Sequence, residues 1–143
     1  MKSQKWKHLK PAPGKKATEY MRGTLTEDNV SSPFSADAFS YINSARTEIA
    51  GEDYLSSPPD PLDATGVLAV ILRPDLPDGE YHVGHPLFQY AVILTAGNVL
   101  HLAESGSLTV INDPNTKEVS GRMHFVAGTV VFDATYNLLP ETK

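Results

Sequence analysis

A run of alternating apolar and polar residues near the C-terminus constrains the fold most. SLTVINDPNTKEVSGRMHF (107–125) holds two such runs around Asp113-Pro114-Asn115-Thr116, residues that suit a type I turn in a four-residue loop. That loop pairs Val110 with Val119. The alternation predicts a hairpin with one apolar and one polar face: Leu108, Val110, Val119, Met123 and Phe125 against Ser107, Thr109, Ser120, Arg122 and His124.

A second hairpin follows directly around Ala127-Gly128. Pairing Val126 with Thr129 places Met123 opposite Phe132 and continues the apolar face without a break. On the polar face, the same register places Arg122 opposite Asp133, an attractive cross-strand pair. The two hairpins together predict an antiparallel meander that is apolar on one side and polar on the other.

The middle of the chain is more apolar. LFQYAVILTAGNVLHLAE (87–104) predicts a hairpin around Ala96-Gly97, in which Leu100 and Leu102 share a face with Ile93. GVLAVILR (66–73) has the same character. Because both faces of these segments are apolar, we expect them to be covered on both sides, in the middle of a two-layer core.

The segment DAFSYINSARTEI (37–49) allows two interpretations. Phe39, Ile42, Ala45 and Ile49 have the spacing of one face of a short helix, and the same residues also fit two short strands around Asn43-Ser44. We favour the strands. The whole chain therefore predicts an all-β fold, an antiparallel β-sandwich or small barrel of about seven to nine strands with room for one short helix.

Charge divides the chain into an arm and a body. Residues 1–22 contain seven Lys/Arg and one acid, a net +6, whereas residues 23–143 contain five Lys/Arg and sixteen acids, a net −11. We expect a basic, flexible arm over 1–18, a single β-sandwich domain over 19–139 and a tail over 140–143. The acidic body disfavours nucleic acid as a partner. Lys5, Trp6, Lys7 and Lys10 would let the arm touch anionic lipid or a partner.

The chain is expected to be soluble. No apolar stretch follows the basic N-terminus, as a signal peptide would require, and the apolar run Gly66–Leu72 is too short to span a bilayer. The compartment stays open. The absence of cysteine excludes a disulfide framework, a thiolate zinc site and a cysteine nucleophile.

The C-terminal half resembles a known group of domains. SGSLTVINDPNTKEVSGRMHFVAGTVVFDATYNL and LPDGEYHVG are similar to the G-x-L-T-I, V-S-G-x-F-x-F, G-x-F and G-x-Y strands of small bacterial β-sandwich domains of unknown function, often found on exported lipoproteins. The resemblance covers about half of the chain and carries no catalytic residue. This chain lacks the signal and the lipid-attachment cysteine of such lipoproteins. The resemblance therefore implies a β-sandwich and no particular activity.

Two histidines three residues apart raise the question of a metal site. His82 and His85 lie in GEYHVGHPLF, where Gly84 and Pro86 argue against a helix, and residues three apart on a strand point to opposite faces. A metal would also need a third ligand such as Glu80, His101 or His124. We favour a bend, and keep a metal-dependent hydrolase at 82–85 as an alternative.

Other residues suit binding better than catalysis. The long loop GEDYLSSPPDPLD (51–63) carries Asp53, Tyr54, Asp60 and Asp63, and Tyr81 lies in the next loop region. No G-x-S-x-G elbow or phosphate-binding glycine loop is present.

We therefore expect a non-enzymatic domain, without a cofactor, that binds a protein, glycan or cell-surface partner through end loops or a strand edge. A membrane-active or toxin-like component that uses the basic arm is the alternative. A homodimer formed by edge pairing is a further expectation.

Overall fold

The computed structural model describes residues 10–11, 19–56, 58, 60 and 63–140. These residues form twelve strands and no helix. The strands are β1 (Lys10–Pro11), β2 (Tyr20–Glu27), β3 (Val30–Ser35), β4 (Ala38–Asn43), β5 (Thr47–Tyr54), β6 (Ala64–Ile71), β7 (Gly79–His82), β8 (Phe88–Thr95), β9 (Val99–Leu102), β10 (Ser105–Asn112), β11 (Val119–Ala127) and β12 (Val130–Leu138).

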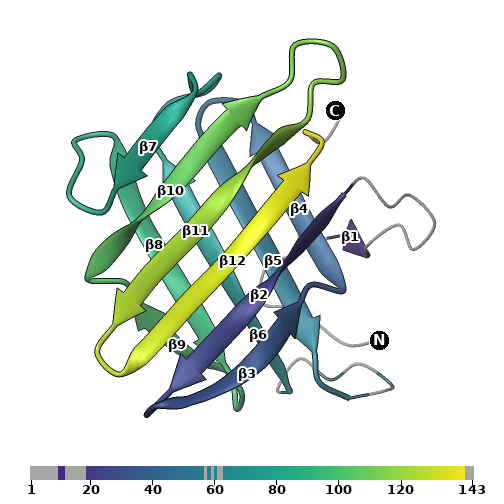
Figure 1. The fold of residues 1–143 in the computed structure, drawn as a ribbon, viewed down its shortest axis with the longest axis vertical. Coiled ribbons are helices and arrows are strands. Elements are labelled where there is room, and N and C mark those ends of the chain that lie inside the picture. Colours follow the sequence, from purple (N-terminus) through teal and green to yellow (C-terminus); the bar gives the residue numbers. More distant parts are fainter. Residues whose placement is uncertain (1–9, 12–18, 57, 59, 61–62, 141–143) are drawn as a thin grey trace.

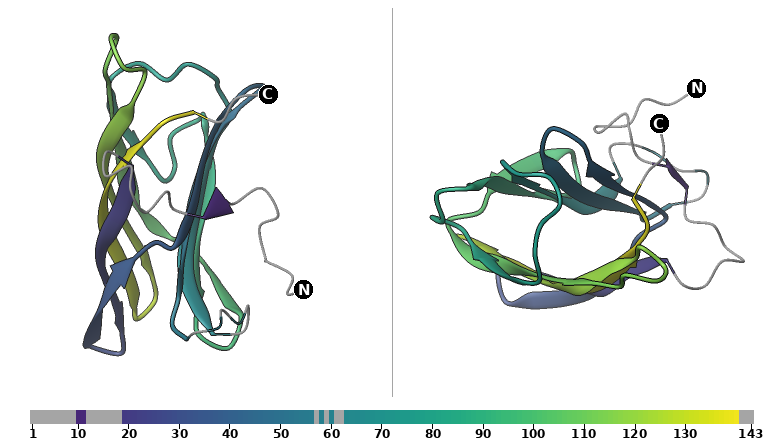
Figure 2. Two further views of the ribbon diagram at one scale, coloured as in Figure 1. Left: turned by 90° about the vertical axis from the view of Figure 1, so that its right-hand side faces the viewer. Right: turned by 90° about the horizontal axis from the view of Figure 1, so that it is seen from above.

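The strands form two antiparallel six-stranded sheets (Figure 1). Sheet A has the order β1-β4-β5-β6-β8-β9, and sheet B has the order β3-β2-β12-β11-β10-β7. The two sheets pack face to face as two layers (Figure 2). The predicted antiparallel β-sandwich is confirmed, with more strands than the sequence indicated.

The core lies between the two sheets. Alternate residues of the longer strands point inward, so the phenylalanines of sheet B meet the aliphatic side chains of sheet A. Phe132 has no exposed surface and packs edge-on against Phe34, with ring centroids 4.9 Å apart. Phe88 of sheet A also packs edge-on against Phe125 of sheet B, with ring centroids 5.9 Å apart, and so joins the two sheets. Aromatic pairs of this geometry add to the hydrophobic gain from burial.

Residues 37–49 form two strands, so the helical alternative is wrong. β4 and β5 are joined by the turn at 44–46, in which Ala45 is exposed. Phe39, Tyr41 and Ile49 face the core, because period-two spacing places them on one side of the sheet. Pairing with neighbouring strands therefore decides this segment, although its spacing also suits a helix.

The register of the β10-β11-β12 meander differs from the prediction by two residues. Val119 lies opposite Asn112, and Met123 lies opposite Ala134. The first loop spans six residues, because the Asp113 amide donates to the Glu118 carbonyl and Lys117 takes a left-handed conformation. A shift of two residues leaves every side chain on its predicted face, so the apolar and polar faces are as expected.

The β8–β9 register differs by one residue, and this difference changes the surface. The turn contains Ala96, Gly97 and Asn98, of which the last two have positive φ, so it is one residue longer than predicted. Leu100 and Leu102 consequently share a face with Val92 and Leu94 and point away from the core. β6 is buried on both faces as predicted, but the prediction that β9 is also covered is wrong.

One partly buried hydrogen bond ties three strands of sheet B together. The hydroxyl of Tyr136 donates to the carbonyl of Thr109 at 2.6 Å, crossing Gly121, which lies opposite Tyr136. Burial raises the pKa of this phenol. A side chain at Gly121 would collide with the Thr109 carbonyl.

We expect Tyr136→Phe to lower the free energy of unfolding by about 1–2 kcal/mol, because the partly buried Thr109 carbonyl loses the donor supplied by the buried Tyr136 side chain. Tyr81→Phe is the matched control: its hydroxyl also donates to a carbonyl at 2.6 Å, that of Pro77, but near solvent. Urea unfolding of both variants measures the difference. Equal losses would contradict the role of burial.

Candidate functional site

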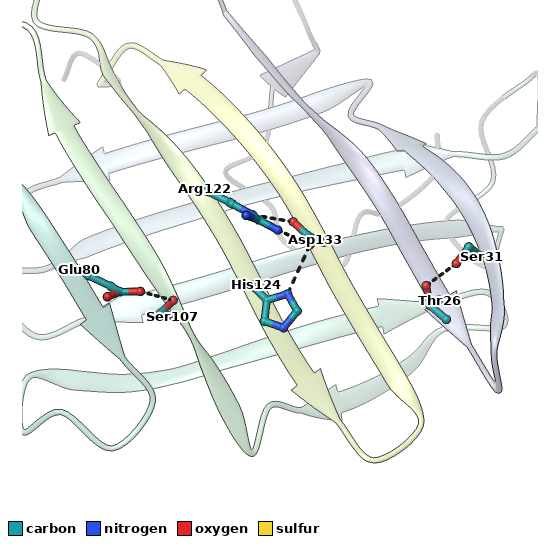
Figure 3. A network of polar contacts seen from close by, with 7 residues as sticks. All are labelled: Thr26, Ser31, Glu80, Ser107, Arg122, His124 and Asp133. Atoms are coloured by element: carbon teal, nitrogen blue, oxygen red, sulfur yellow. Dashed lines mark hydrogen bonds and ion pairs between the residues drawn. The ribbon is translucent and has the colours of Figure 1, made fainter.

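A row of polar side chains crosses the outer face of sheet B. His82, Ser107, His124 and Asp133 occupy directly opposed positions on β7, β10, β11 and β12. Figure 3 shows three of them with Glu80 and Arg122 beside them. The types Ser, His and Asp on neighbouring strands are those of a serine hydrolase triad, so their contacts decide what the row can do.

The contacts do not activate a nucleophile. The hydroxyl of Ser107 is directed at Glu80, 3.0 Å from Oε2, and not at His124 (Figure 3). Asp133 is held by Arg122 through two hydrogen bonds of 3.0 and 2.7 Å, and His124 Nδ1 lies 3.4 Å from the same carboxylate. A serine nucleophile needs an imidazole within hydrogen-bond reach, and the Ser107 hydroxyl contacts Glu80 instead. The carboxylate of Asp133 mainly binds Arg122.

The Arg122–Asp133 pair lies on a diagonal, because Arg122 is opposite Thr135 and Asp133 is opposite His124. The predicted ion pair between Arg122 and Asp133 is present, although the two residues are not directly opposite each other as the predicted register had them. Hydrogen bonds from the guanidinium hold the pKa of Asp133 below its usual range. Around this pair the surface forms a shallow pocket of about 350 Å³ lined by Glu80, Ser107, Thr109, Arg122 and His124.

The predicted loop residues separate into different environments. Asp53 accepts a hydrogen bond from the Ser35 amide at 3.0 Å, and Asp37 accepts one from the Tyr54 amide at 2.8 Å. Asp60 and Asp63 lie further along, where the Asp63 amide donates to the Asp60 carbonyl. The side chain of Tyr54 packs against apolar residues on the outer face of sheet A. The carboxylate of Asp53 therefore binds the last residue of β3.

Burial raises the pKa of Asp53, the Ser35 amide opposes this shift, and the nearby Asp37 carboxylate adds to it. Because the folded-state pKa lies above the unfolded value, ionisation of Asp53 destabilises the fold as the pH rises through these values. We expect Asp53→Asn to gain stability relative to the native chain between about pH 4 and pH 7. Thermal unfolding across this range measures the gain.

Asp133→Asn is the control of opposite sign. Its folded-state pKa is lowered, so its contribution is present above the unfolded pKa and is lost as the pH falls. This variant should lose stability relative to the native chain as the pH rises from strongly acid conditions to the unfolded aspartate value of about 4, and the deficit should stay constant above that pH. Thermal unfolding from about pH 2 to pH 7 therefore covers both variants. Parallel curves for the two variants would contradict both assignments.

The segment 79–85 forms a strand followed by a bend. Nε2 of His82 lies 3.7 Å from Glu80 on the exposed face, whereas Nδ1 of His85 accepts a hydrogen bond from the Leu87 amide. The ring of His85 also packs edge-on against Tyr81. Across the residues that the structure describes, no group of three or more His, Asp or Glu side chains is arranged to hold a metal ion. His101, a suggested third ligand, contacts Thr95 Oγ1 at 2.9 Å.

The predicted arm lies mostly outside the described residues. Lys5, Trp6 and Lys7 are not among them, and Lys10 is placed only by the pairing of β1 with β4. The hypothesis of a membrane-binding arm stays a prediction. Within the described ranges, no helix has the length and apolar character needed to cross a membrane.

The outer face of sheet A contains an apolar surface that sequence reasoning missed. One row of directly opposed positions consists of Ser40, Ala50, Leu68, Val92 and Leu102. Leu68 is 8% exposed, and Tyr54 and Tyr90 pack against its cluster. At the β9 end, by contrast, Leu102 is 64% exposed and Leu100 47%. The apolar face therefore reaches solvent at one edge of the sheet.

The four outer strands of the sandwich differ in how they are protected. Three contain features that discourage pairing with another chain: Pro11 in β1, Pro33 in β3, and the charged Glu80 beside His82 in the short β7. β9 has the sequence Val-Leu-His-Leu, without proline, lysine, arginine or acid. In the described part of the chain no strand pairs with its outer side.

Comparison with known proteins adds no further assignment: no family model, curated protein or solved structure matches this chain. The resemblance to small lipoprotein-associated domains stays a prediction. The surface at β9 is thus the feature of this molecule that most needs a functional explanation.

Proposed function

We propose that this chain is a non-enzymatic interaction domain that binds a protein partner at the β9 edge of sheet A. The observation that carries the proposal is that β9 is an edge strand without proline or charged residues, and that its two leucines are exposed. An extended segment of a partner can add to such an edge through main-chain hydrogen bonds, with side-chain contacts supplying specificity.

A protein suits this surface better than a glycan. The exposed side chains at the edge are the aliphatic Val99, Leu100 and Leu102, whereas sugar recognition by stacking needs exposed aromatic rings. Tyr54 and Tyr90 lie nearby but pack against the apolar cluster. Aliphatic side chains next to unpaired backbone groups favour a strand of polypeptide.

Affinity capture with edge variants tests the proposal. The tagged full-length chain should retain a partner that the double variant Leu100→Lys/Leu102→Lys loses, because lysine on an edge strand opposes pairing and breaks the apolar contact. Val30→Lys on β3 is the matched control, since Val30 is also exposed on an outer strand. Thermal unfolding should show that both variants fold.

Two results would overturn the proposal. If the double variant retains the partner as well as the control does, binding uses another surface. If the native chain retains no protein that the double variant loses, an untagged copy of this chain added to the lysate included, the chain does not work as a binding domain through this edge.

A further inference from the structure

We infer that the partner at the β9 edge is a second copy of this chain, paired antiparallel about a two-fold axis; this inference rests on the proposed function. The first step concerns which backbone groups are available. The Ala103 amide donates to the Ala91 carbonyl across to β8 at 2.8 Å. Because hydrogen-bonding direction alternates along an antiparallel strand, His101 also faces β8, and Leu100 and Leu102 direct their N–H and C=O groups outward.

The outward groups are arranged symmetrically around His101. With the two-fold axis at this residue, Leu100 lies opposite Leu102 of the partner subunit, and Leu102 lies opposite the partner subunit's Leu100. Each pair exchanges two main-chain hydrogen bonds, so about four form across the axis. An isologous contact needs a surface complementary to itself, and this short strand meets that condition.

The side chains favour the same arrangement. Leu100 and Leu102 lie on the outer face with Val92 and Leu94, so pairing brings the leucines of both copies together and continues the apolar face across the axis. β9 carries no Lys, Arg, Asp or Glu, and a two-fold axis through it therefore juxtaposes none of their charges. It also offers none of these charges for recognising a different, charged partner.

The other three outer strands are less suited to pairing with their own copy. Pairing at β7 would place the charged Glu80 of both copies in the interface, and Pro11 in β1 and Pro33 in β3 have no N–H to donate. The inference therefore selects one edge of the four. Since the strand is only four residues long, we expect a weak dimer with a Kd on the order of 1–100 μM.

Sedimentation equilibrium of the full-length chain over this concentration range tests the inference. The native chain and Val30→Lys should show the same reversible monomer–dimer equilibrium, whereas Leu100→Lys/Leu102→Lys should stay monomeric. Leu102→Pro should also be monomeric: it removes an outward N–H and leaves the pairing with β8 in place. A native chain that is monomeric throughout, or a dimer that survives both edge variants, would overturn the inference.

Photo-crosslinking from position 102 in a cell lysate separates failure of the inference from failure of the proposed function. A product of twice the chain mass supports both. A product with a different protein overturns the inference and leaves the proposed function standing. Cross-linking that is no stronger from position 102 than from position 30 overturns both.

Discussion

Gly106→Ala is expected to lower the free energy of unfolding by about 3–5 kcal/mol, because two costs combine at this position. Gly106 has φ of +123°, a conformation that residues with a Cβ rarely adopt. A Cβ would also lie 2.0 Å from the backbone carbonyl oxygen of His124 on β11. The obstacle is backbone, so it can move only if β10 and β11 separate. Urea unfolding measures the loss.

Gly84→Ala provides the matched control. Gly84 has φ of +101°, but a Cβ there would meet nothing within 4 Å. This variant keeps the conformational cost and lacks the clash, so we expect a loss of only about 1 kcal/mol. A loss at Gly106 no larger than that at Gly84 would show that the β10–β11 contact relaxes easily, which contradicts the close approach described above.

Phe132→Ala is expected to cost about 3–5 kcal/mol, through lost burial and the cavity left behind. Phe132 has no exposed surface, lies opposite Phe125 on β11 and packs on Phe34 of β3. Its removal therefore loosens two neighbours at once. Guanidinium unfolding should show a lower midpoint and a retained slope, since the same surface is exposed on unfolding.

Phe132→Leu separates the effect of buried volume from the effect of the aromatic contact. Leucine keeps much of the buried apolar volume but loses the edge-on contact with Phe34, so we expect a loss of about 1–2 kcal/mol. If the alanine variant were no less stable than the leucine variant, the cavity would be closing by collapse of the two sheets. The account of a tightly packed core would then be wrong.

The sequence predicts faces more reliably than registers. In β10, β11 and β12 every predicted inward residue is buried, because alternation depends only on the order of residues along one strand. The pairing partners depend on loop geometry. The Asp113 carboxylate accepts hydrogen bonds from the amides of Asn115 and Thr116, and the left-handed Lys117 lengthens the loop. The residue types at 113–116 predict a turn but do not indicate its length.

The candidate surface was missed for the same reason. One extra residue, Asn98, in the β8–β9 turn moves Leu100 and Leu102 from the predicted covered face to solvent. Asn98 follows Gly97, and both residue types tolerate positive φ, so a longer turn was the signal that could have been used. Asp53 could not be placed from sequence, because its carboxylate accepts a hydrogen bond from the amide of Ser35, which lies on a strand of the other sheet.

Amide hydrogen exchange at β9 tests the central claim most directly. In dilute protein the amides of Leu100 and Leu102 should exchange rapidly and that of His101 slowly, because only the latter faces β8. As the concentration rises, or when a partner is added, both leucine amides should become protected together. Rapid exchange of Leu100 and Leu102 in the bound state would contradict binding at the β9 edge.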